Sequence, residues 1–397
     1  MKILLLAQRV PYPPNRGDKI TTWRLIERMK REHDVTVIAF AHDEADLAAA
    51  RTLAERGFHC IAVPHRERVK KLLSLPLLLT TKPLTLGVYS SRALQAEVDR
   101  HVAEADVAYA YSSSMGAFLL PHRIPWVMHF AELDSDKWRQ YSRRKGFPMR
   151  YVYEREWLTL LAFERKLAAA ARTNVFCTPL EEAVFQRDVP GWPSVVLRNG
   201  VDLEYYRPGA GETEPGHLVF VGVMDYYPNV DGCVHFVREI LPRVRERHPK
   251  ARFTIVGSRP SREVERLAEE PGVEVTGFVD DTREYLRKAA VSVAPLRIAR
   301  GIQNKVLEAL AMGLPVVGTE SATQGVDGQP GRDYVRADSA EDQARAISEL
   351  LSDPEKARKL GQRGRRLVEA NYDWDVTLAP LDDILTDCLQ PAPGTES

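Results

Sequence analysis

The side chains best suited to chemistry lie in residues 294–319, APLRIARGIQNKVLEALAMGLPVVGT. This stretch predicts a strand, a glycine-containing turn, a helix over 303–312 and a second strand. The start of such a helix offers free backbone N–H groups and the positive end of a dipole, which suit a phosphate. Arg300 in the turn and Lys305 in the first helical turn add cations at the same place. The residues that line this predicted phosphate site with their backbone are Gly301, Ile302, Gln303 and Asn304.

Glu308 follows Lys305 by three residues and therefore lies on the same face of the predicted helix. A carboxylate there could accept hydrogen bonds from the paired hydroxyls of a ribose, while the cations hold a diphosphate. Taken alone, Lys305 and Glu308 are more typical of a surface ion pair on an ordinary helix. The small, apolar residues that follow and run straight into a strand favour instead a nucleotide lying across the helix start.

The elements that must position these residues alternate along the whole chain. Short runs of Val, Ile and Leu are followed by segments of helical period, which is typical of parallel sheets built from βαβ units. The predicted strands are 2–7, 35–40, 59–63, 107–111, 126–130, 174–178 and 195–197 in one domain, and 217–222, 252–257, 273–276, 291–295 and 315–319 in a second. The main predicted helices are 19–31, 151–171, 229–246, 262–270, 282–289, 303–312 and 376–389. Pro, Gly and acidic residues concentrate at 206–216, the predicted linker. Two such sheets in tandem predict a ligand cleft at the carboxyl ends of their strands.

The composition of the chain argues against several classes of protein. The 397 residues include 55 Lys and Arg against 55 Asp and Glu, and this balance argues against a nucleic-acid-coating protein. The four cysteines are scattered without a C-x-x-C pair, which predicts neither a disulfide framework nor a structural zinc site. Together with an N-terminal apolar run too short for a signal peptide, this cysteine usage favours a reducing, cytoplasmic location. The first predicted strand is not followed by G-x-G-x-x-G, which argues against a nicotinamide dehydrogenase.

Four motifs in order carry a resemblance to a known family. They are RNGVD at 198–202, HLVFVG, VEVTGFVDD with YLRKAAVSVAPL, and NKVLEALAMGLPVV. With the opening MKILLLAQRVPYPPNRGDKITTWRLIERM, the sequence resembles the retaining nucleotide-sugar glycosyltransferases of GT-B fold, the glycogen-synthase-like "glycosyl transferases group one" superfamily. The sequence is also similar to the sugar transferases of PEP-CTERM/exosortase exopolysaccharide systems. This narrower similarity lies in PYPPNRGDK, MHFAELDSDKW, VGVMDYYPNVDG and GIQNKVLEALAMG.

The resemblance implies two Rossmann-like, doubly wound domains that face a central cleft. Residues 1–205 would bind the acceptor and residues 206–374 the nucleotide-sugar donor, and a C-terminal helix at about 375–389 would cross back to the first domain. The reaction would retain the anomeric configuration, with the leaving diphosphate helping to deprotonate the acceptor hydroxyl. No metal and no cofactor would be needed, because cations and a helix dipole stabilise the leaving group.

Three positions take roles from the resemblance. Glu308 matches the second glutamate of the family's paired-glutamate motif, which binds the donor ribose. Gly17 matches the glycine-rich loop that approaches the donor phosphates and the acceptor. His129, on the predicted strand 126–130, matches a histidine that points into the cleft near the donor sugar, where it would provide an oriented hydrogen bond.

Two departures from the family pattern concern charge. Arg300 stands where the family has its first glutamate, so the preference for a donor sugar does not carry over. After Gly222 many relatives have an Arg and a Lys against the diphosphate, whereas this chain continues VMDYYPNVDG. Because a diphosphate left unpaired in a water-poor cleft is costly, we expect Arg300 and Lys305 to take over this role, with Arg16 or Lys19 contributing from the first domain. The predicted catalytic side chains are therefore His129, Arg300 and Lys305.

Residues 66–83, RERVKKLLSLPLLLTTKP, combine a basic start with several Leu residues and are too short and interrupted to cross a bilayer. Two interpretations fit them. They dock on the anionic inner leaflet, where a lipid-linked acceptor resides, or they form a helical pair that covers the first sheet. Trp374, in the NYDW sequence before the last helix, is predicted to anchor the crossover.

The predicted partners are thus a nucleotide-sugar donor and a saccharide or lipid-linked acceptor, and no nucleic acid. Peripheral contact with the cytoplasmic face of the membrane follows if residues 66–83 dock there. Two alternatives stay open: a sugar-nucleotide 2-epimerase of the same fold, and a non-catalytic sugar-binding protein, which Arg300 makes conceivable.

Overall fold

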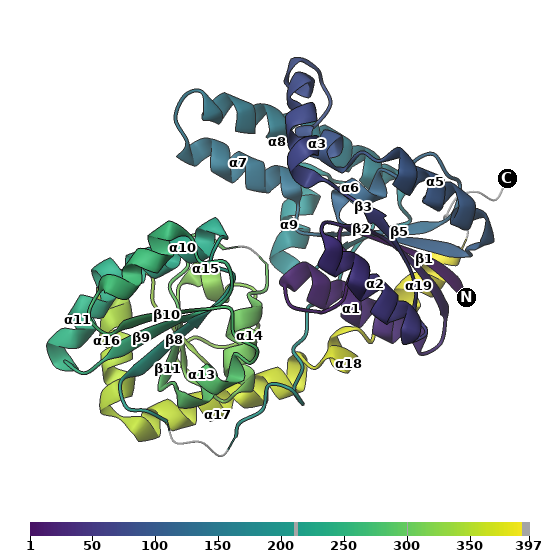
Figure 1. Ribbon diagram of the computed structural model, residues 1–397. Helices are drawn as coiled ribbons and strands as arrows, with labels where there is room; N and C mark the ends of the chain where they lie inside the picture. Colours follow the sequence, from purple (N-terminus) through teal and green to yellow (C-terminus); the bar gives the residue numbers. More distant parts are fainter. Residues whose placement is uncertain (210–212, 300, 391–397) are drawn as a thin grey trace. The chain divides into compact units, whose positions relative to one another are not determined.

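The computed structural model describes residues 1–209, 213–299 and 301–390, with the side chain of residue 144 also left out, and divides into two compact units. The first unit comprises Met1–Leu197 and the chain from Leu378 onward, and the second comprises Arg198–Thr377. Each unit contains one parallel sheet with helices packed around it (Figure 1). The two Rossmann-like domains predicted from the sequence are therefore confirmed.

The sheet of the first unit has the strand order β3-β2-β1-β4-β5-β6-β7, so the order reverses between β1 and β4. Its strands are β1 Lys2–Ala7, β2 Asp34–Ala41, β3 His59–Pro64, β4 Val107–Tyr111, β5 Trp126–Ala131, β6 Thr173–Phe176 and β7 Ser194–Val196. Apolar residues such as Leu4, Leu5 and Leu6 are buried in succession along β1. Such uninterrupted burial is expected where helices cover both faces of a parallel sheet.

The helical segments of the first unit are α1 Gly17–Lys30, α2 Glu44–Glu55, α3 Glu67–Leu73, η1 Leu75–Leu79, α4 Leu84–Tyr89, α5 Arg92–His101, η2 Val102–Glu104, α6 Ser113–Gly116, α7 Asp134–Arg144, α8 Met149–Ala170, α9 Pro179–Asp188 and α19 Leu381–Leu389. The C-terminal α19 packs against β4 and β5, which confirms the predicted return of the chain to the first domain. The predicted helix 376–389 is interrupted, because α18 ends at Thr377 and α19 begins after Pro380, whose ring cannot continue a helix.

The sheet of the second unit has the order β10-β9-β8-β11-β12-β13. Its strands are β8 His217–Val221, β9 Arg252–Val256, β10 Val273–Gly277, β11 Val291–Ala294, β12 Val316–Gly318 and β13 Val335–Arg336. Its helical segments are α10 Tyr227–His235, η3 Phe236–Ile240, α11 Leu241–Arg247, α12 Arg262–Glu265, η4 Arg266–Glu269, α13 Arg283–Lys288, α14 Asn304–Ala311, α15 Glu320–Thr323, α16 Ala340–Ser352, α17 Pro354–Asn371 and α18 Trp374–Thr377. The short β13 was not predicted, because two residues are too few to show the alternation of apolar and polar side chains that indicates a strand.

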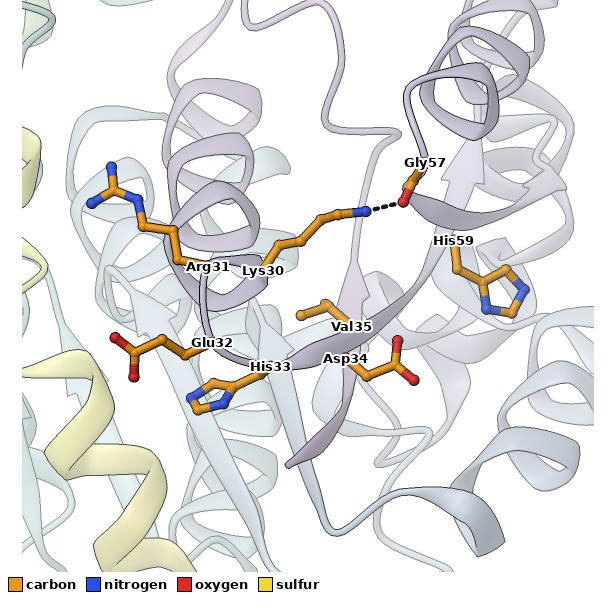
Figure 2. Close-up of a pocket in the computed structure, with 8 residues that line it drawn as sticks. All are labelled: Lys30, Arg31, Glu32, His33, Asp34, Val35, Gly57 and His59. Atoms are coloured by element: carbon orange, nitrogen blue, oxygen red, sulfur yellow. Dashed lines mark hydrogen bonds between the residues drawn. The ribbon is translucent and has the colours of Figure 1, made fainter.

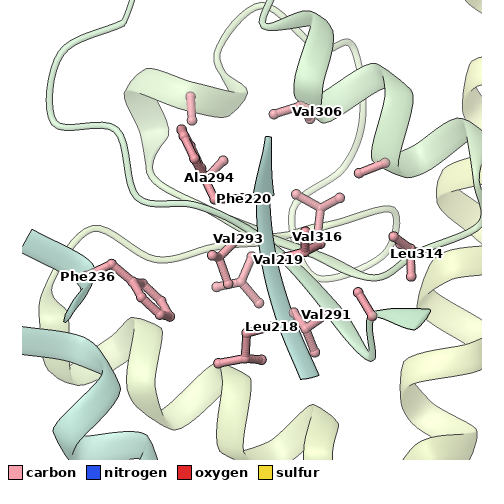
Figure 3. Close-up of a cluster of buried hydrophobic side chains, with 14 of the residues drawn as sticks. Leu218, Val219, Phe220, Phe236, Val291, Val293, Ala294, Val306, Leu314 and Val316 are labelled. Carbon is pink, nitrogen blue, oxygen red and sulfur yellow. The ribbon is translucent and has the colours of Figure 1, made fainter. Parts of the chain in front are cut away.

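The core of the second unit fixes the elements that carry the candidate site (Figure 3). Leu218 and Phe220 of β8, Val291 of β11 and Val306 of α14 are all at most 1% exposed, and Phe236 packs with them. Burying side chains of this size stabilises a fold by about 1.5–3 kcal/mol each. The loop after β8 and the start of α14 are therefore held on a rigid base.

The boundary between the units lies upstream of the predicted linker. It falls between Leu197 and Arg198, so RNGVD belongs to the second unit, where the Val201 N–H donates to Tyr372 O at 2.7 Å. A Cβ on Gly200 would lie 2.8 Å from a ring carbon of Trp374, so this tryptophan packs against RNGVD inside the second unit. Its role as an anchor of the crossover stays a prediction. The described part of 206–216 is a loop inside the second unit, where Glu214 N donates to the carbonyl of Lys288, at the end of α13, at 2.8 Å.

Candidate functional site

The loop after β8 lies at the point where the strand order of the second sheet reverses, between β8 and β11. Gly222 begins this loop, and its N–H donates to Val256 O at 3.0 Å. Gly257, at the end of β9, has a φ of +150°, and a Cβ on it would lie 1.7 Å from Gly222 O. Only glycine allows the two chain segments to approach this closely. Open parallel sheets bind ligands at such a reversal point. Gly222 lies there, and its contact with the donor stays a prediction.

Lys305, the second residue of α14, is held at this place by a neutral side chain. Its Nζ donates to Asn229 Oδ1 at 2.9 Å and lies 5.1 Å from the ring centroid of Phe220. Asn229 is buried and is fixed in turn by its own amide, which donates to Val223 O at 2.9 Å. Burial lowers the pKa of Lys305 to about 8, and nearby Glu308 opposes this shift. The result is a desolvated cation at the edge of the loop that follows β8.

Glu308, one helical turn further, is a desolvated carboxyl group. Burial raises its pKa to about 7, while Lys305 and a hydrogen bond from the Tyr206 hydroxyl act against the rise. Tyr206 is positioned by Thr282, and burial raises the pKa of its phenol. The preceding Tyr205 lies beneath Arg283, with 3.7 Å between the guanidinium carbon and the ring centroid. Glu308 thus lies beside the 205–206 segment, which is itself held by Thr282 and Arg283.

The start of α14 is formed by the residues predicted to line a phosphate. Gly301 has a φ of +62°, and space is open where a Cβ would project from it. Ile302 is nearly buried, Gln303 takes the extended conformation that precedes the first helical turn, and Asn304 begins the helix. Arg300 lies outside the described residues, so its predicted role stays a prediction.

In the first unit, Gly17 is the first residue of α1 and not part of the loop before it, because this helix begins two residues earlier than predicted. Its approach to the donor phosphates stays a prediction. Arg16 precedes Gly17 and donates from Nε to Asp18 Oδ1 at 2.6 Å. Lys19 is different, because its Nζ lies 2.7 Å from Asp46 Oδ1, and both side chains are less than a tenth exposed. The charge of Lys19 is neutralised inside the first unit, which is a correction to its predicted contact with a donor phosphate.

His129 also differs from the prediction. It is 0% exposed on β5, with Nδ1 at 2.7 Å from the Tyr109 hydroxyl and Nε2 at 3.6 Å from Cys177 Sγ. Burial lowers its pKa to about 3, so the imidazole is neutral at physiological pH. In this structure His129 is a hydrogen-bonded residue of the sheet interior and does not point to an open face.

The comparisons with known proteins agree with this geometry. Residues 215–353 match the family model described as glycosyl transferases group 1. The chain is 34% identical over 243 residues to the "Putative glycosyltransferase EpsD" of Bacillus subtilis, a match that covers 56% of this chain and 61% of that protein. The structure superposes with a TM-score of 0.72 on sucrose-phosphate synthase from Thermosynechococcus elongatus, at 18% identity, over 97% of this chain and 98% of the other. Residues 215–353 thus match this family, and the chain as a whole has the fold of the GT-B glycosyltransferase superfamily.

Other relatives within this superfamily are similar over shorter or more diverged stretches. A GDP-mannose-dependent alpha-(1-6)-phosphatidylinositol monomannoside mannosyltransferase of Mycobacterium tuberculosis is 33% identical over 160 residues, which is 36% of this chain and 42% of that protein. Anabaena HepE in complex with UDP has a TM-score of 0.71 at 15% identity, over 97% of this chain and all of the other. The matched segments thus span less than two thirds of the curated relatives.

Three residues of the site were not predicted from the sequence: Tyr206, Asn229 and Gly257. Asn229 lies in the PNVDG motif, which the sequence analysis treated only as a run without a cation. Its importance becomes visible through the bond to Lys305, 76 residues away along the chain. Gly257 could have been predicted, because a glycine directly after a buried strand often marks a close approach of two backbone segments.

The carboxyl ends of β4 and β5 in the first unit carry a further feature of this GT-B chain that was not predicted. Ser112 and Ala131 adopt φ values of 82° and 63°, which are unfavourable for residues with a Cβ. Next to them, Ser113 Oγ donates to Asp134 Oδ2 at 2.7 Å and Gln8 Nε2 donates to Ser114 Oγ at 2.6 Å. These polar groups gather where the strand order of the first sheet reverses.

A hollow in the first unit lies elsewhere (Figure 2). It is lined from the end of α1 and from Asp34, Val35 and His59 at the amino ends of β2 and β3. Lys30 closes one side by donating to the carbonyl of Gly57. None of the predicted site residues lines it, so this hollow is not part of the candidate site.

Proposed function

We propose that this protein transfers a sugar from a nucleotide diphosphate sugar to a hydroxyl of a saccharide or lipid-linked acceptor, with retention of configuration. The observation that carries the proposal is the arrangement of Lys305 and Glu308 at the start of α14. Both ionisable groups are desolvated, and their hydrogen bonds go to the neutral side chains of Asn229 and Tyr206. Such groups gain most from a ligand that brings the missing charge and donors.

A nucleotide diphosphate would supply both the negative charge and the hydrogen-bond donors. A diphosphate beside Lys305 would stabilise the ammonium form and raise its pKa above about 8. Ribose hydroxyls that donate to Glu308 would stabilise the carboxylate and lower its pKa below about 7. The start of α14 would add backbone donors, and the open space at Gly301 lets the phosphates approach the backbone.

In the transfer step, the acceptor oxygen forms the new bond to the anomeric carbon as the bond from that carbon to the diphosphate breaks. The acceptor proton passes to an oxygen of the leaving diphosphate. Lys305 and the start of α14 would stabilise the negative charge that develops on the leaving group. His129 does not serve as a proton acceptor in this proposal, because it is buried and bonded to Tyr109.

The substrate class follows from the relatives. Two of them are named as a GDP-mannose-dependent mannosyltransferase and as EpsD, and a structural neighbour is titled as a complex with UDP. We therefore propose GDP- or UDP-linked hexoses as donors and a glycan of the cell surface, including exopolysaccharide, as the product. No metal and no cofactor takes part in the proposed reaction.

The test is nucleotide binding and turnover by Lys305→Met. Calorimetry with UDP and GDP should show binding at least about thirtyfold weaker than wild type, since removing one member of a desolvated charge contact costs about 2–5 kcal/mol. Lys288→Met, an exposed lysine of α13, is the matched control and should bind as wild type. Unchanged affinity of Lys305→Met for both nucleotides would overturn the proposed donor site.

Turnover separates the transferase from the alternatives. With a panel of UDP- and GDP-hexoses, release of the nucleotide diphosphate should depend on added acceptor, and the proton spectrum of the product should show the anomeric configuration of the donor. Interconversion of two donor sugars without acceptor would identify an epimerase. Binding without release of nucleotide from any donor and acceptor pair would identify a non-catalytic protein.

A further inference from the structure

Exposed apolar side chains are concentrated in one part of the first unit. In α3 and η1, Leu72 and Leu73 are 69% exposed and Leu79 is 92% exposed, and no described residue of either segment is buried. This excludes the interpretation of residues 66–83 as a helical pair that covers the sheet. Single exposed leucines are common, but a contiguous group of them marks an interaction surface.

A second exposed apolar group lies at the α7–α8 turn and along α8. Phe147 is 85% exposed, and Met149, Tyr151 and Leu158 are also exposed. Tyr151 and Leu158 share one face of α8 with Arg155, because they are spaced four and three residues from it. These residues and those of α3–η1 are called the basic-apolar surface below.

Contacts of α8 fix the two groups to each other. Arg155 donates to the carbonyl groups of Leu77, Thr80 and Lys82, the last at 2.9 Å. The neighbouring Glu156, which is buried, accepts from Leu84 N at 2.7 Å and Thr85 N at 2.8 Å. The segment that follows η1 is therefore held on α8, so both apolar groups are carried by elements that contact each other within the first unit.

The charge of this surface is positive, most clearly at α3 and η1. Residues 66–82 contain five Lys and Arg against Glu67 alone, and residues 145–158 contain Lys145, Arg150 and Arg155 against Glu154 and the buried Glu156, in a chain whose charges balance overall. Glu67 is engaged within the surface, with Lys71 Nζ at 2.7 Å and His42 Nδ1 at 3.3 Å. Exposed Arg66, Arg68 and Lys71 therefore surround the leucines of α3 and η1 with positive charge.

We propose that the basic-apolar surface docks on an anionic lipid bilayer. Apolar side chains inserted at the acyl boundary, flanked by Lys and Arg at the level of anionic headgroups, are what binds a peripheral protein to such a membrane. Arg, Tyr, Phe and Met are also enriched at protein–protein interfaces, so self-association is measured as an alternative outcome. The docked surface would bring the acceptor-binding unit to the place where a lipid-linked substrate lies.

The test is flotation of the full-length protein with phosphatidylcholine vesicles, with and without phosphatidylglycerol. Wild type should bind the anionic vesicles, and binding should weaken as salt is raised. Arg66→Glu/Arg68→Glu should lower binding at least about tenfold, since each basic residue near an anionic surface contributes on the order of one factor of five. Both positions lie at the start of α3, where acidic residues are favourable, so the helix is retained.

Leu72→Glu/Leu79→Glu tests the apolar contribution, and it should lower binding at least about tenfold even at low salt. The matched controls are Arg51→Glu/Arg92→Glu and Leu180→Glu, all at exposed positions of other helices in the same unit. They should bind within about twofold of wild type, given the small effect expected for distant sites.

Three results would overturn the proposal: no binding of wild type to anionic vesicles, equal losses in test and control variants, or a self-association in sedimentation that the surface variants abolish. The last result would assign the surface to a second copy of the chain. UDP and GDP binding by the same variants, measured in parallel, should equal wild type. Failure of the lipid surface is therefore separable from failure of the donor site.

Discussion

Each unit contains one desolvated lysine near an acid, and the two pairs are arranged differently. In the first unit, Lys19 and Asp46 meet at 2.7 Å and satisfy each other. In the second unit, Lys305 bonds to Asn229 and Glu308 to Tyr206, so both charged groups have neutral hydrogen-bond partners. A buried ion pair that is complete in itself holds a fold together, whereas desolvated charges with neutral partners leave room for a charged ligand.

The largest expected effect is the loss of free energy of unfolding in Gly257→Ala. This variant tests whether damage to the site of the second unit leaves the first unit unchanged. A Cβ at 1.7 Å from Gly222 O forces β8 and β9 apart at their carboxyl ends, and we expect a loss of at least about 3 kcal/mol. Hydrogen exchange should rise in peptides of β8 and β9 and stay unchanged in β1 and β2.

The control for this change is Gly331→Ala in the same unit. Gly331 has a φ of +81°, and no atom lies within 4 Å of the place that a Cβ would take, so the substitution adds only backbone strain, about 1–2 kcal/mol. Equal losses for the two variants would show that the approach of Gly222 and Gly257 is not tight.

Lys19→Met breaks the complete pair of the first unit. Asp46 would remain buried, still accepting from His42 N at 2.9 Å but without its cation, and we expect a loss of about 3 kcal/mol in urea unfolding. UDP and GDP binding should stay unchanged. Lys305→Met should show the reverse, with binding lost and stability equal to or above wild type, because a desolvated charge is removed.

The rescue variant is Lys19→Met/Asp46→Leu, in which an apolar pair replaces the ions. It should recover most of the lost stability, as replacing both members of a buried pair is close to neutral. A Lys19→Met variant that is as stable as wild type but binds nucleotide poorly would contradict the structural role assigned to the Lys19–Asp46 pair.

The smallest expected effect is the pH dependence of UDP or GDP binding. Below about pH 7 the Glu308 carboxyl gains a proton and stops accepting from the ribose, and above about pH 8 Lys305 loses its charge. Affinity for the nucleotide should therefore be highest between about pH 7 and about pH 8. It should fall by at most about tenfold for each pH unit below or above this range. Glu308→Gln should flatten the acid side only, and a profile identical to wild type would contradict the assignment.

All strands but the two-residue β13 could be predicted, because most are short runs of buried apolar residues. The boundary between the units could not, since the Pro- and Gly-rich segment 206–216 is a loop of the second unit whose partner, Lys288, is distant in sequence. Sequence spacing placed Lys305 and Glu308 on one helical face, which the structure shows, but the bonds to Asn229 and Tyr206 depend on tertiary contacts.

Two site predictions failed for the same physical reason. His129 and Lys19 are polar residues in otherwise apolar surroundings, and a sequence does not tell whether such a residue faces a ligand or an internal partner. For His129 the partner is Tyr109 on the neighbouring strand, and for Lys19 it is Asp46, 27 residues away. Both partners satisfy the polar group inside the first unit.

The position of α19 has a consequence for how the protein is made. Leu381, Leu385 and Cys388 of this helix are buried against the first sheet, and Asp382 pairs with Arg28 of α1. While the ribosome is still translating, the N-terminal sheet lacks this cover, although most of its strands have already emerged. The first unit can therefore complete its fold only after the whole chain of the second unit has been synthesised.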